Sequence, residues 1–246
     1  MSSHRFFIPE DWITRNTVVI TGRLVHRLRN VLRLRAGAHI IVLDDTGWEY
    51  EVELKTVEND EIEGAVLNRN LAAGEPRTKM TLCQALLKGS NFELVLQKCT
   101  EVGVSEFVPM LCERCVAGEP DSKRLDRWKS IIIEAAEQSK RGNLPVLQNV
   151  TPFNDACNST SGLSLIPWEG EAIQGIGDIL KTNQNAAKVS IFVGPEGGLS
   201  PGEIELARSR GIIPVSLGPR TLRAETAGLV AATITLYEFG DIDELP

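Results

Sequence analysis

The chain has 246 residues, of which 42% are hydrophobic and 24% charged, and its formal net charge at pH 7 is −7. No apolar run approaches the roughly 20 residues that span a bilayer, and the N-terminal stretch is too short for a signal peptide. The five cysteines are an odd set, which argues against a disulfide framework, so the sequence predicts a cytoplasmic protein with a substantial buried core.

The N-terminal part of the chain contains short runs that are typical of β-strands. They lie at residues 17–20, 39–43, 48–54 and 61–67. The run from residue 48 alternates between polar and apolar residues, as a half-buried strand does. We predict that residues 1–73 form a small β-barrel domain, close to the OB or PUA modules that bind RNA, with a linker at residues 72–76.

Basic side chains are concentrated in this part, against the sign of the rest of the chain. Residues 1–40 hold seven arginines and two acids, which gives +5, so the remaining 206 residues carry −12. Such a segment is either the electrostatic footprint of a phosphate backbone or a solvated helix face, and the contrast in sign favours the first. The predicted RNA contacts are Arg5, Arg23, His26, Arg29 and Arg33.

From residue 80 onward, expected strands and helices alternate. Strands are expected at residues 80–86, 107–111, 145–150, 163–167, 189–193 and 213–217. Helices are expected from Ser90 to Gly103 and at residues 123–140, 201–210 and 227–239, with a flexible polar loop at residues 154–162. This alternation predicts an α/β fold in which helices cover both faces of a parallel sheet, so residues 74–246 form a second domain.

One pair of cysteines, Cys112 and Cys115, has the spacing C-x-x-C. A zinc site would need two further ligands, and the sequence has no second C-x-x-C and no H-x-x-x-H. Ordinary buried or half-buried thiols are the preferred interpretation, and no metal is implied.

Two glycine-containing blocks follow two of the expected strands, at residues 194–203 (GPEGGLSPGE) and 217–227 (LGPRTLRAETA). Strand-to-helix junctions at the C-terminal edge of a parallel sheet are where α/β folds place ligands, so the two blocks suggest one composite pocket. The glycines of the first block allow positive φ and leave no Cβ, which lets backbone amides approach a ligand. Ser200 is expected to cap the following helix, with Glu203 as its capping-box partner.

The first block favours a neutral or cationic ligand with an adenosine part. No lysine follows the glycines as in a P-loop, the dinucleotide pattern G-x-G-x-x-G is missing, and Glu196 would repel a phosphate. A purely structural glycine turn is the alternative interpretation.

The two blocks together resemble the C-terminal signature of SPOUT methyltransferases, and specifically the RsmE family of 16S rRNA (uracil-N3)-methyltransferases. Similar blocks occur in the family's order at residues 26–37, 84–89, 97–104 and 134–141, so the resemblance covers nearly the whole chain. The sequence departs from the family at Leu87, where Pro is frequent, and at Val102, which replaces Leu.

The resemblance implies S-adenosylmethionine as cofactor, a C-terminal trefoil knot, a homodimer, and 16S rRNA within the 30S subunit as substrate. The expected cofactor contacts are Gly194, Pro195, Gly197, Gly198, Leu217, Gly218, Leu222 and Thr226. Arg223 is expected to stabilise the uracil anion, and Glu196 to favour the sulfonium or orient the ligand. Glu225 would orient Arg223 or cap the last helix. Another RNA target, a non-catalytic RNA-binding assembly protein and, most distantly, a nucleotide hydrolase are the alternatives.

Overall fold

The computed structural model describes residues 4–171 and 174–242, and the chain divides into two compact units. Unit 1 comprises Met1–Glu75 and Ala136–Leu144, and unit 2 comprises Pro76–Ala135 and Pro145–Pro246. Within the described part of the chain, no helix is long and apolar enough to cross a membrane.

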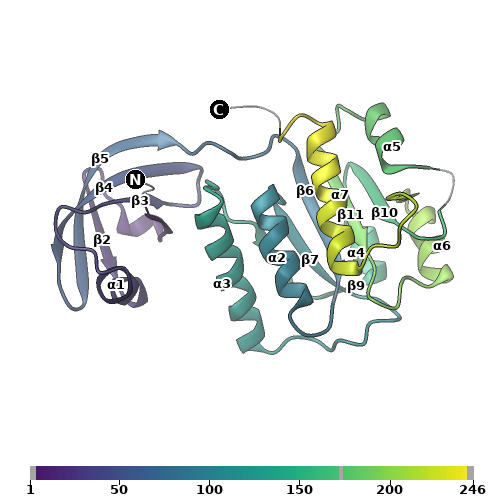
Figure 1. Cartoon of the computed structure of the whole chain (residues 1–246), viewed down its shortest axis with the longest axis horizontal. Helices are drawn as coiled ribbons and strands as arrows, with labels where there is room; N and C mark the ends of the chain where they lie inside the picture. The colour runs from purple at the N-terminus through teal and green to yellow at the C-terminus, as the bar shows by residue number, and fades with distance from the viewer. Residues whose placement is uncertain (1–3, 172–173, 243–246) are drawn as a thin grey trace. The chain divides into compact units, whose positions relative to one another are not determined.

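Unit 1 is built on a five-stranded sheet with the order β1-β3-β4-β5-β2 (Figure 1). The strands are β1 (His4–Phe7), β2 (Thr17–Thr21), β3 (His39–Leu43), β4 (Trp48–Val57) and β5 (Glu61–Leu71). The four expected strands are confirmed, whereas β1 was missed because its four residues give too short a pattern. Strand β1 pairs in parallel with β3 and places Phe6 in the core, while the other pairings are antiparallel.

The part of the basic segment from Arg23 to Val31 is a short helical turn. It consists of α1 (Arg23–His26) and η2 (Arg27–Val31), and a second short turn, η1 (Glu10–Trp12), precedes β2. Val25 and Leu28 lie three residues apart on one face and are buried in the unit 1 core. The polar residues between them therefore point outward.

The segment expected as a linker ends in a buried ion pair within unit 1. Glu75 accepts hydrogen bonds from the Arg141 guanidinium at 3.1 and 2.9 Å and from the backbone N–H groups of Gly142 and Asn143. Burial alone raises the pKa of Glu75, but the bonds and charge of Arg141 outweigh it and hold this pKa below its ordinary value. A carboxylate with these partners fixes the end of the linker.

Unit 2 contains a sheet in which every pairing is parallel, as predicted, with the order β12-β10-β11-β6-β7-β8 and with β9 also pairing with β7. Its strands are β6 (Lys79–Ala85), β7 (Glu106–Leu111), β8 (Val146–Leu147), β9 (Thr151–Pro152), β10 (Leu163–Pro167), β11 (Lys188–Val193) and β12 (Ile213–Val215). The single strand expected at residues 145–150 is confirmed only in part. Val146–Leu147 pair with β7 as β8, and the next pairing with β7 is β9, which begins at Thr151, after the expected strand.

Six helices are described in unit 2, the last three residues of α3 belonging to unit 1: α2 (Asn91–Val102), α3 (Ser122–Gln138), α4 (Phe153–Asn158), α5 (Ile176–Thr182), α6 (Pro201–Ser209) and α7 (Ala224–Glu238). Helices α2, α3, α6 and α7 confirm the expected ones. The flexible loop expected at residues 154–162 is wrong at its start, because α4 buries Phe153, Ala156 and Cys157. Only three residues anchor this helix, so its apolar pattern is too short to be seen in a polar sequence.

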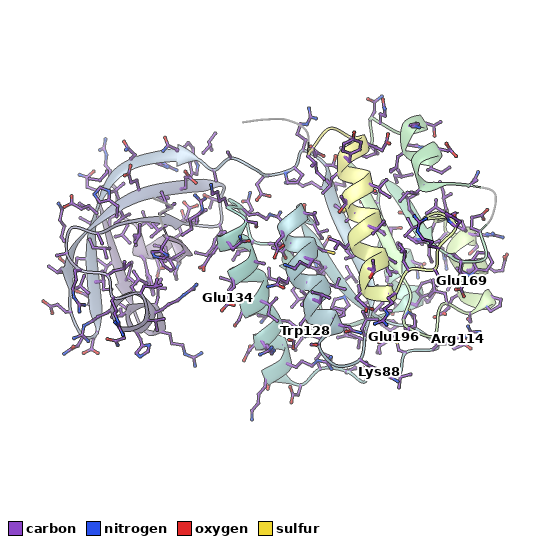
Figure 2. The ribbon with its side chains drawn as sticks, viewed as in Figure 1. Lys88, Arg114, Trp128, Glu134, Glu169 and Glu196 are labelled. Atoms are coloured by element: carbon purple, nitrogen blue, oxygen red, sulfur yellow. The ribbon has the colours of Figure 1, made fainter. Side chains whose placement is uncertain are left out.

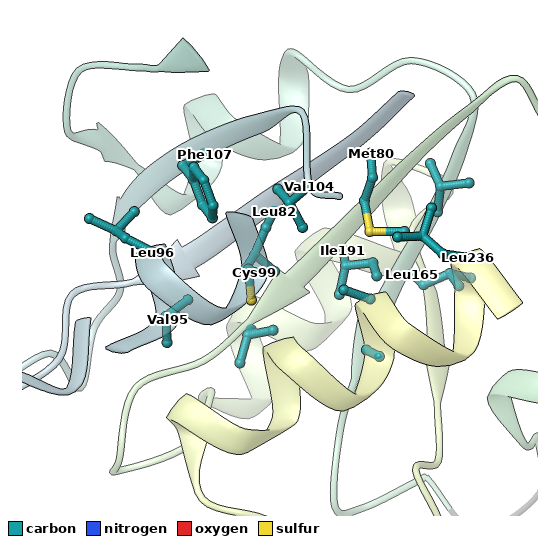
Figure 3. Close-up of a cluster of buried hydrophobic side chains, with 14 of the residues drawn as sticks. Met80, Leu82, Val95, Leu96, Cys99, Val104, Phe107, Leu165, Ile191 and Leu236 are labelled. Atoms are coloured by element: carbon teal, nitrogen blue, oxygen red, sulfur yellow. The ribbon is translucent and has the colours of Figure 1, made fainter. Parts of the chain in front are cut away.

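Helices cover both faces of the sheet, and alternate residues of each strand point to opposite faces. In β6, Met80 and Leu82 join a cluster with residues of α2, α3, α5 and α7 (Figure 3). Cys83 and Ala85 join a second cluster with residues of α4 and α6. Since both faces are buried, the C-terminal edge of the sheet is the place left for a ligand.

Candidate functional site

The order of the central strands brings three loops to the C-terminal edge of the sheet. Strand β10 lies between β11 and β12, so the ends of β11 and β12 are about 10 Å apart. The expected cofactor contacts follow these two strands: Gly194, Pro195, Gly197 and Gly198 after β11, then Leu217, Gly218, Leu222 and Thr226 after β12. The loop after β10 lies between the two groups.

The three glycines after β11 serve two different purposes. Only Gly198, with φ +69°, adopts the left-handed conformation that all three were expected to allow. A Cβ on Gly194 would lie 2.8 Å from Leu199 Cγ, and one on Gly197 would lie 3.2 Å from Arg114 Cβ. Close packing therefore explains Gly194 and Gly197, and backbone conformation explains Gly198.

The capping box predicted after this loop is confirmed. Ser200 Oγ accepts a hydrogen bond from the Glu203 backbone N–H at 3.3 Å, and Glu203 Oε2 accepts one from the Ser200 N–H at 2.8 Å. Glu203 Oε1 also accepts a hydrogen bond from the Glu113 N–H at 2.8 Å. The buried Glu203 carboxylate thus holds the start of α6 and the turn after β7 together.

Glu196, an expected site residue, is exposed but held in place. Its Oε1 accepts a hydrogen bond from the backbone N–H of Lys88 at 2.9 Å, in the loop that follows β6. Figure 2 shows Lys88 and Glu196 together at the end of unit 2 where α7 begins. The bond orients the carboxylate, because it fixes one of its two oxygens.

Two side chains at this edge were not identified from the sequence. Arg114, in the turn after β7, donates from Nη1 to the Gly197 carbonyl at 3.2 Å. Glu169 follows β10, and a Cβ built on Gly198 would lie 3.7 Å from its Oε1. Both residues come directly after the end of a parallel strand, and that position was the signal available in the sequence.

The strand before the second glycine block ends earlier than the expected residue 217. Strand β12 ends at Val215, and Ser216 instead donates its N–H to the Gln174 carbonyl at 2.8 Å. Gly218 has φ +103°, and a Cβ there would meet nothing within 4 Å. The backbone therefore turns at Gly218 toward open space, while Leu217 and Leu222 are half-buried on either side.

Arg223, the expected catalytic arginine, precedes the first residue of α7, and its side chain is 87% exposed. Its Nη1 lies 4.0 Å from Glu225 Oε1, in the first turn of the helix. A surface pair at this distance contributes little energy, so Arg223 is free to turn toward a substrate. Thr226 is half-buried in the same turn.

The predicted RNA contacts in unit 1 are not equally available. Arg5 donates to Glu49 at 2.6 Å and its side chain is only 12% exposed, so little of it is accessible, and its contact with RNA stays a prediction. Arg23, His26 and Arg33 are exposed and Arg29 is half-buried on the helical turn. These four remain as a basic surface.

Comparison with known proteins extends these observations. Residues 74–236 match the model of the RNA methyltransferase domain family. The chain is 36% identical over 234 residues to the ribosomal RNA small subunit methyltransferase E of Synechocystis sp., covering 93% of this chain and 76% of that protein. It is 32% identical to the Bacillus subtilis protein of the same name, with 90% of each covered.

A solved structure of the ribosomal RNA small subunit methyltransferase E from Neisseria gonorrhoeae, bound to S-adenosyl methionine, is similar to this fold with a TM-score of 0.86. It is 32% identical, and the similarity covers 94% of this chain and 95% of that one. The family match over residues 74–236 includes the strands and loops of the candidate site.

Proposed function

Because the chain belongs to the ribosomal RNA small subunit methyltransferase E family, we propose that it methylates N3 of a uridine in the RNA of the small ribosomal subunit. It is a transferase that uses S-adenosylmethionine and methylates ribosomal RNA of the small subunit. The observation that carries the proposal is that the loops after β10, β11 and β12 meet at one sheet edge, with the oriented carboxylate of Glu196 and the exposed guanidinium of Arg223.

The residues present fit an adenosine-containing cofactor. The loop after β11 excludes side chains at Gly194 and Gly197, and the backbone at Gly218 faces open space. Backbone groups of these loops would hold adenine and ribose without a phosphate site. The proposed set is Gly194, Gly198, Leu217, Gly218 and Leu222, with Pro195, Gly197 and Thr226 beside them.

Charge at the site supports methyl transfer. S-adenosylmethionine, when bound, supplies an electrophilic methyl group on a positively charged sulfur. Glu196 is held by the Lys88 N–H, so its negative charge is in place before any cation arrives. A fixed carboxylate lowers the free energy of a nearby cation without reorganisation, and Glu169 adds a second negative charge at this edge.

Arg223 is proposed to act on the uracil. Methylation at N3 requires loss of the N3 proton, and negative charge then spreads over the ring. An exposed guanidinium can approach a base that enters from outside and stabilise that charge. Because N3 lies on the Watson–Crick edge, the base must be unpaired or taken out of the stack first.

Family membership also supports four proposals about architecture and assembly. We propose a trefoil knot within residues 74–246 and a PUA-like RNA-binding barrel in residues 1–73, which carries the basic surface of Arg23, His26, Arg29 and Arg33. A homodimer would use α7, whose residues 229–236 are mostly apolar and where Tyr237 is 55% exposed. The cytoplasmic 30S subunit would be the substrate.

The test uses 30S subunits from cells that lack this methylation, labelled S-adenosylmethionine and purified protein, with the methylated nucleoside identified by mass spectrometry. N3-methyluridine is the expected product, and any other methylated nucleoside would overturn the proposed acceptor. We expect Arg223→Ala to lower kcat about 100-fold while cofactor affinity is unchanged. Arg220→Ala, an exposed arginine in the same loop, is the matched control and should retain activity.

A further inference from the structure

The C-x-x-C segment forms a tight turn at the end of β7. The Cys115 N–H donates to the Cys112 carbonyl at 3.0 Å, the hydrogen bond of a four-residue β-turn. The end residues of such a turn have Cα atoms within about 7 Å, which overlaps the separation of about 4.4–6.8 Å found in disulfides. The Cys112 N–H also donates to Cys115 Sγ at 3.3 Å.

The two thiols have different environments. A hydrogen bond from the Cys112 thiol lowers the pKa of Cys115 to about 7, although burial opposes this. The same bond, together with burial, raises the pKa of Cys112 above its ordinary value. Cys115 is half-buried and Cys112 is buried, so the more acidic thiol is also the more accessible one. This is the arrangement of a reactive and a resolving cysteine.

The other cysteines lack this combination. Cys83, Cys99 and Cys157 are all buried. Burial raises the pKa of Cys99 to about 12 and that of Cys157 to about 11, and it raises that of Cys83 as well. Thiols that stay protonated and buried are inert, so they serve as internal controls.

The turn is attached to the loop after β11 and to the first turn of α6 by one contact from each of its two central residues. Arg114 donates to the Gly197 carbonyl at 3.2 Å, and Glu113 donates its N–H to Glu203 at 2.8 Å. Cys115 Sγ lies 3.8 Å from the Leu86 carbonyl, at the start of the loop after β6. A change in the turn therefore acts directly on two loops of the candidate site.

We propose that Cys112 and Cys115 form an oxidation site, at which a peroxide closes a reversible disulfide, and that closing it weakens cofactor binding by the loop after β11. The second part rests on the proposed function, whereas the first stands on the thiols alone. Oxidation replaces the hydrogen bond between the two thiols by a shorter covalent bond and removes the thiol proton of Cys115, whose sulfur lies 3.8 Å from the Leu86 carbonyl. Because the turn packs closely on Gly197, the loop cannot remain unchanged.

The chemistry balances with hydrogen peroxide as the oxidant. The Cys115 thiolate attacks one peroxide oxygen, the O–O bond breaks, and the other oxygen leaves as hydroxide and takes up a proton to give water. The Cys112 sulfur then attacks the sulfenic acid on Cys115, the S–O bond breaks, and hydroxide leaves with the Cys112 thiol proton as a second water. One peroxide is reduced and two thiols are oxidised to one disulfide.

The first experiment tests the oxidation site. The reduced full-length protein is exposed to hydrogen peroxide, free thiols are alkylated, and trypsin cuts after Arg114, so a disulfide would join two peptides that otherwise separate. We expect the joined peptides in the native protein and in Cys157→Ser, and their loss after dithiothreitol. In Cys112→Ser we expect a sulfenic acid at Cys115 that reacts with dimedone. Alkylation of both thiols in the peroxide-treated native protein would overturn the site.

The second experiment tests whether the disulfide weakens cofactor binding. Calorimetry measures S-adenosylmethionine binding to reduced, oxidised and re-reduced protein. We expect oxidation to weaken affinity about tenfold, a typical coupling between sites, with recovery on reduction and no effect in Cys115→Ser. A disulfide that leaves affinity unchanged would overturn the coupling. Reduced protein that binds no S-adenosylmethionine would contradict the proposed function, while the peptide result would still decide the oxidation site.

Discussion

Replacement of Glu203 by alanine should destabilise the protein, because one buried carboxylate connects two loops of the site. Its oxygens accept hydrogen bonds from the N–H groups of Ser200 and Glu113, both at 2.8 Å. A hydrogen bond to a charged group contributes about 1.5–3 kcal/mol, so losing two lowers the free energy of unfolding by about 3 kcal/mol or more. The bond from the residue 203 backbone N–H to Ser200 Oγ remains, since it does not use the lost side chain.

For a chain of this size, each kcal/mol changes the midpoint of thermal unfolding by about 2–4 °C, so we expect a decrease of about 6–12 °C. Circular dichroism measures this midpoint. Glu205→Ala is the matched control on the same helix, because that side chain is 72% exposed and pairs only at the surface with Arg208. Removing the Glu205 side chain should lower the free energy of unfolding by at most about 0.5 kcal/mol. Equal midpoints for the two variants would refute the connecting role of Glu203.

Three further predictions concern other parts of the molecule. Gly198→Val should abolish calorimetric S-adenosylmethionine binding, because a branched side chain is strained at φ +69° and would enter the proposed pocket. Gly202→Ala, whose Cβ would make only an ordinary contact, should bind normally. Replacing Arg29 and Arg33 by alanine should weaken RNA binding and reduce its salt dependence in filter-binding assays, and an equal loss of cofactor affinity would instead indicate a folding role. The lowered pKa of Glu75 stabilises the fold fully above about pH 4.5 and progressively less as pH falls. Urea unfolding at pH 7 and pH 3 should therefore show a smaller pH dependence in Glu75→Gln, and an unchanged difference would contradict this.

Sequence reasoning succeeded where a feature depends on neighbours along the chain. The capping box of Ser200 and Glu203 spans three residues, and the alternation of β4 is visible in its own sequence. It failed where the local pattern was short, as in β1 and α4, because a few buried residues do not produce a recognisable period. The ion pair of Arg5 was also not predictable from neighbouring residues, because its partner Glu49 is 44 residues away in the chain.

By itself, the sequence determined the parallel α/β architecture of unit 2, the two glycine blocks and the positions of the helices that follow them. The tertiary structure alone decided which loops surround the first block. Lys88 reaches Glu196 and Arg114 reaches Gly197 because the sheet places β6 beside β11 and β7 beside β6, although these partners are 83 residues or more apart in the chain. Strand order is set by burial of both sheet faces over the whole unit, so short-range patterns could predict the loop but not its partners.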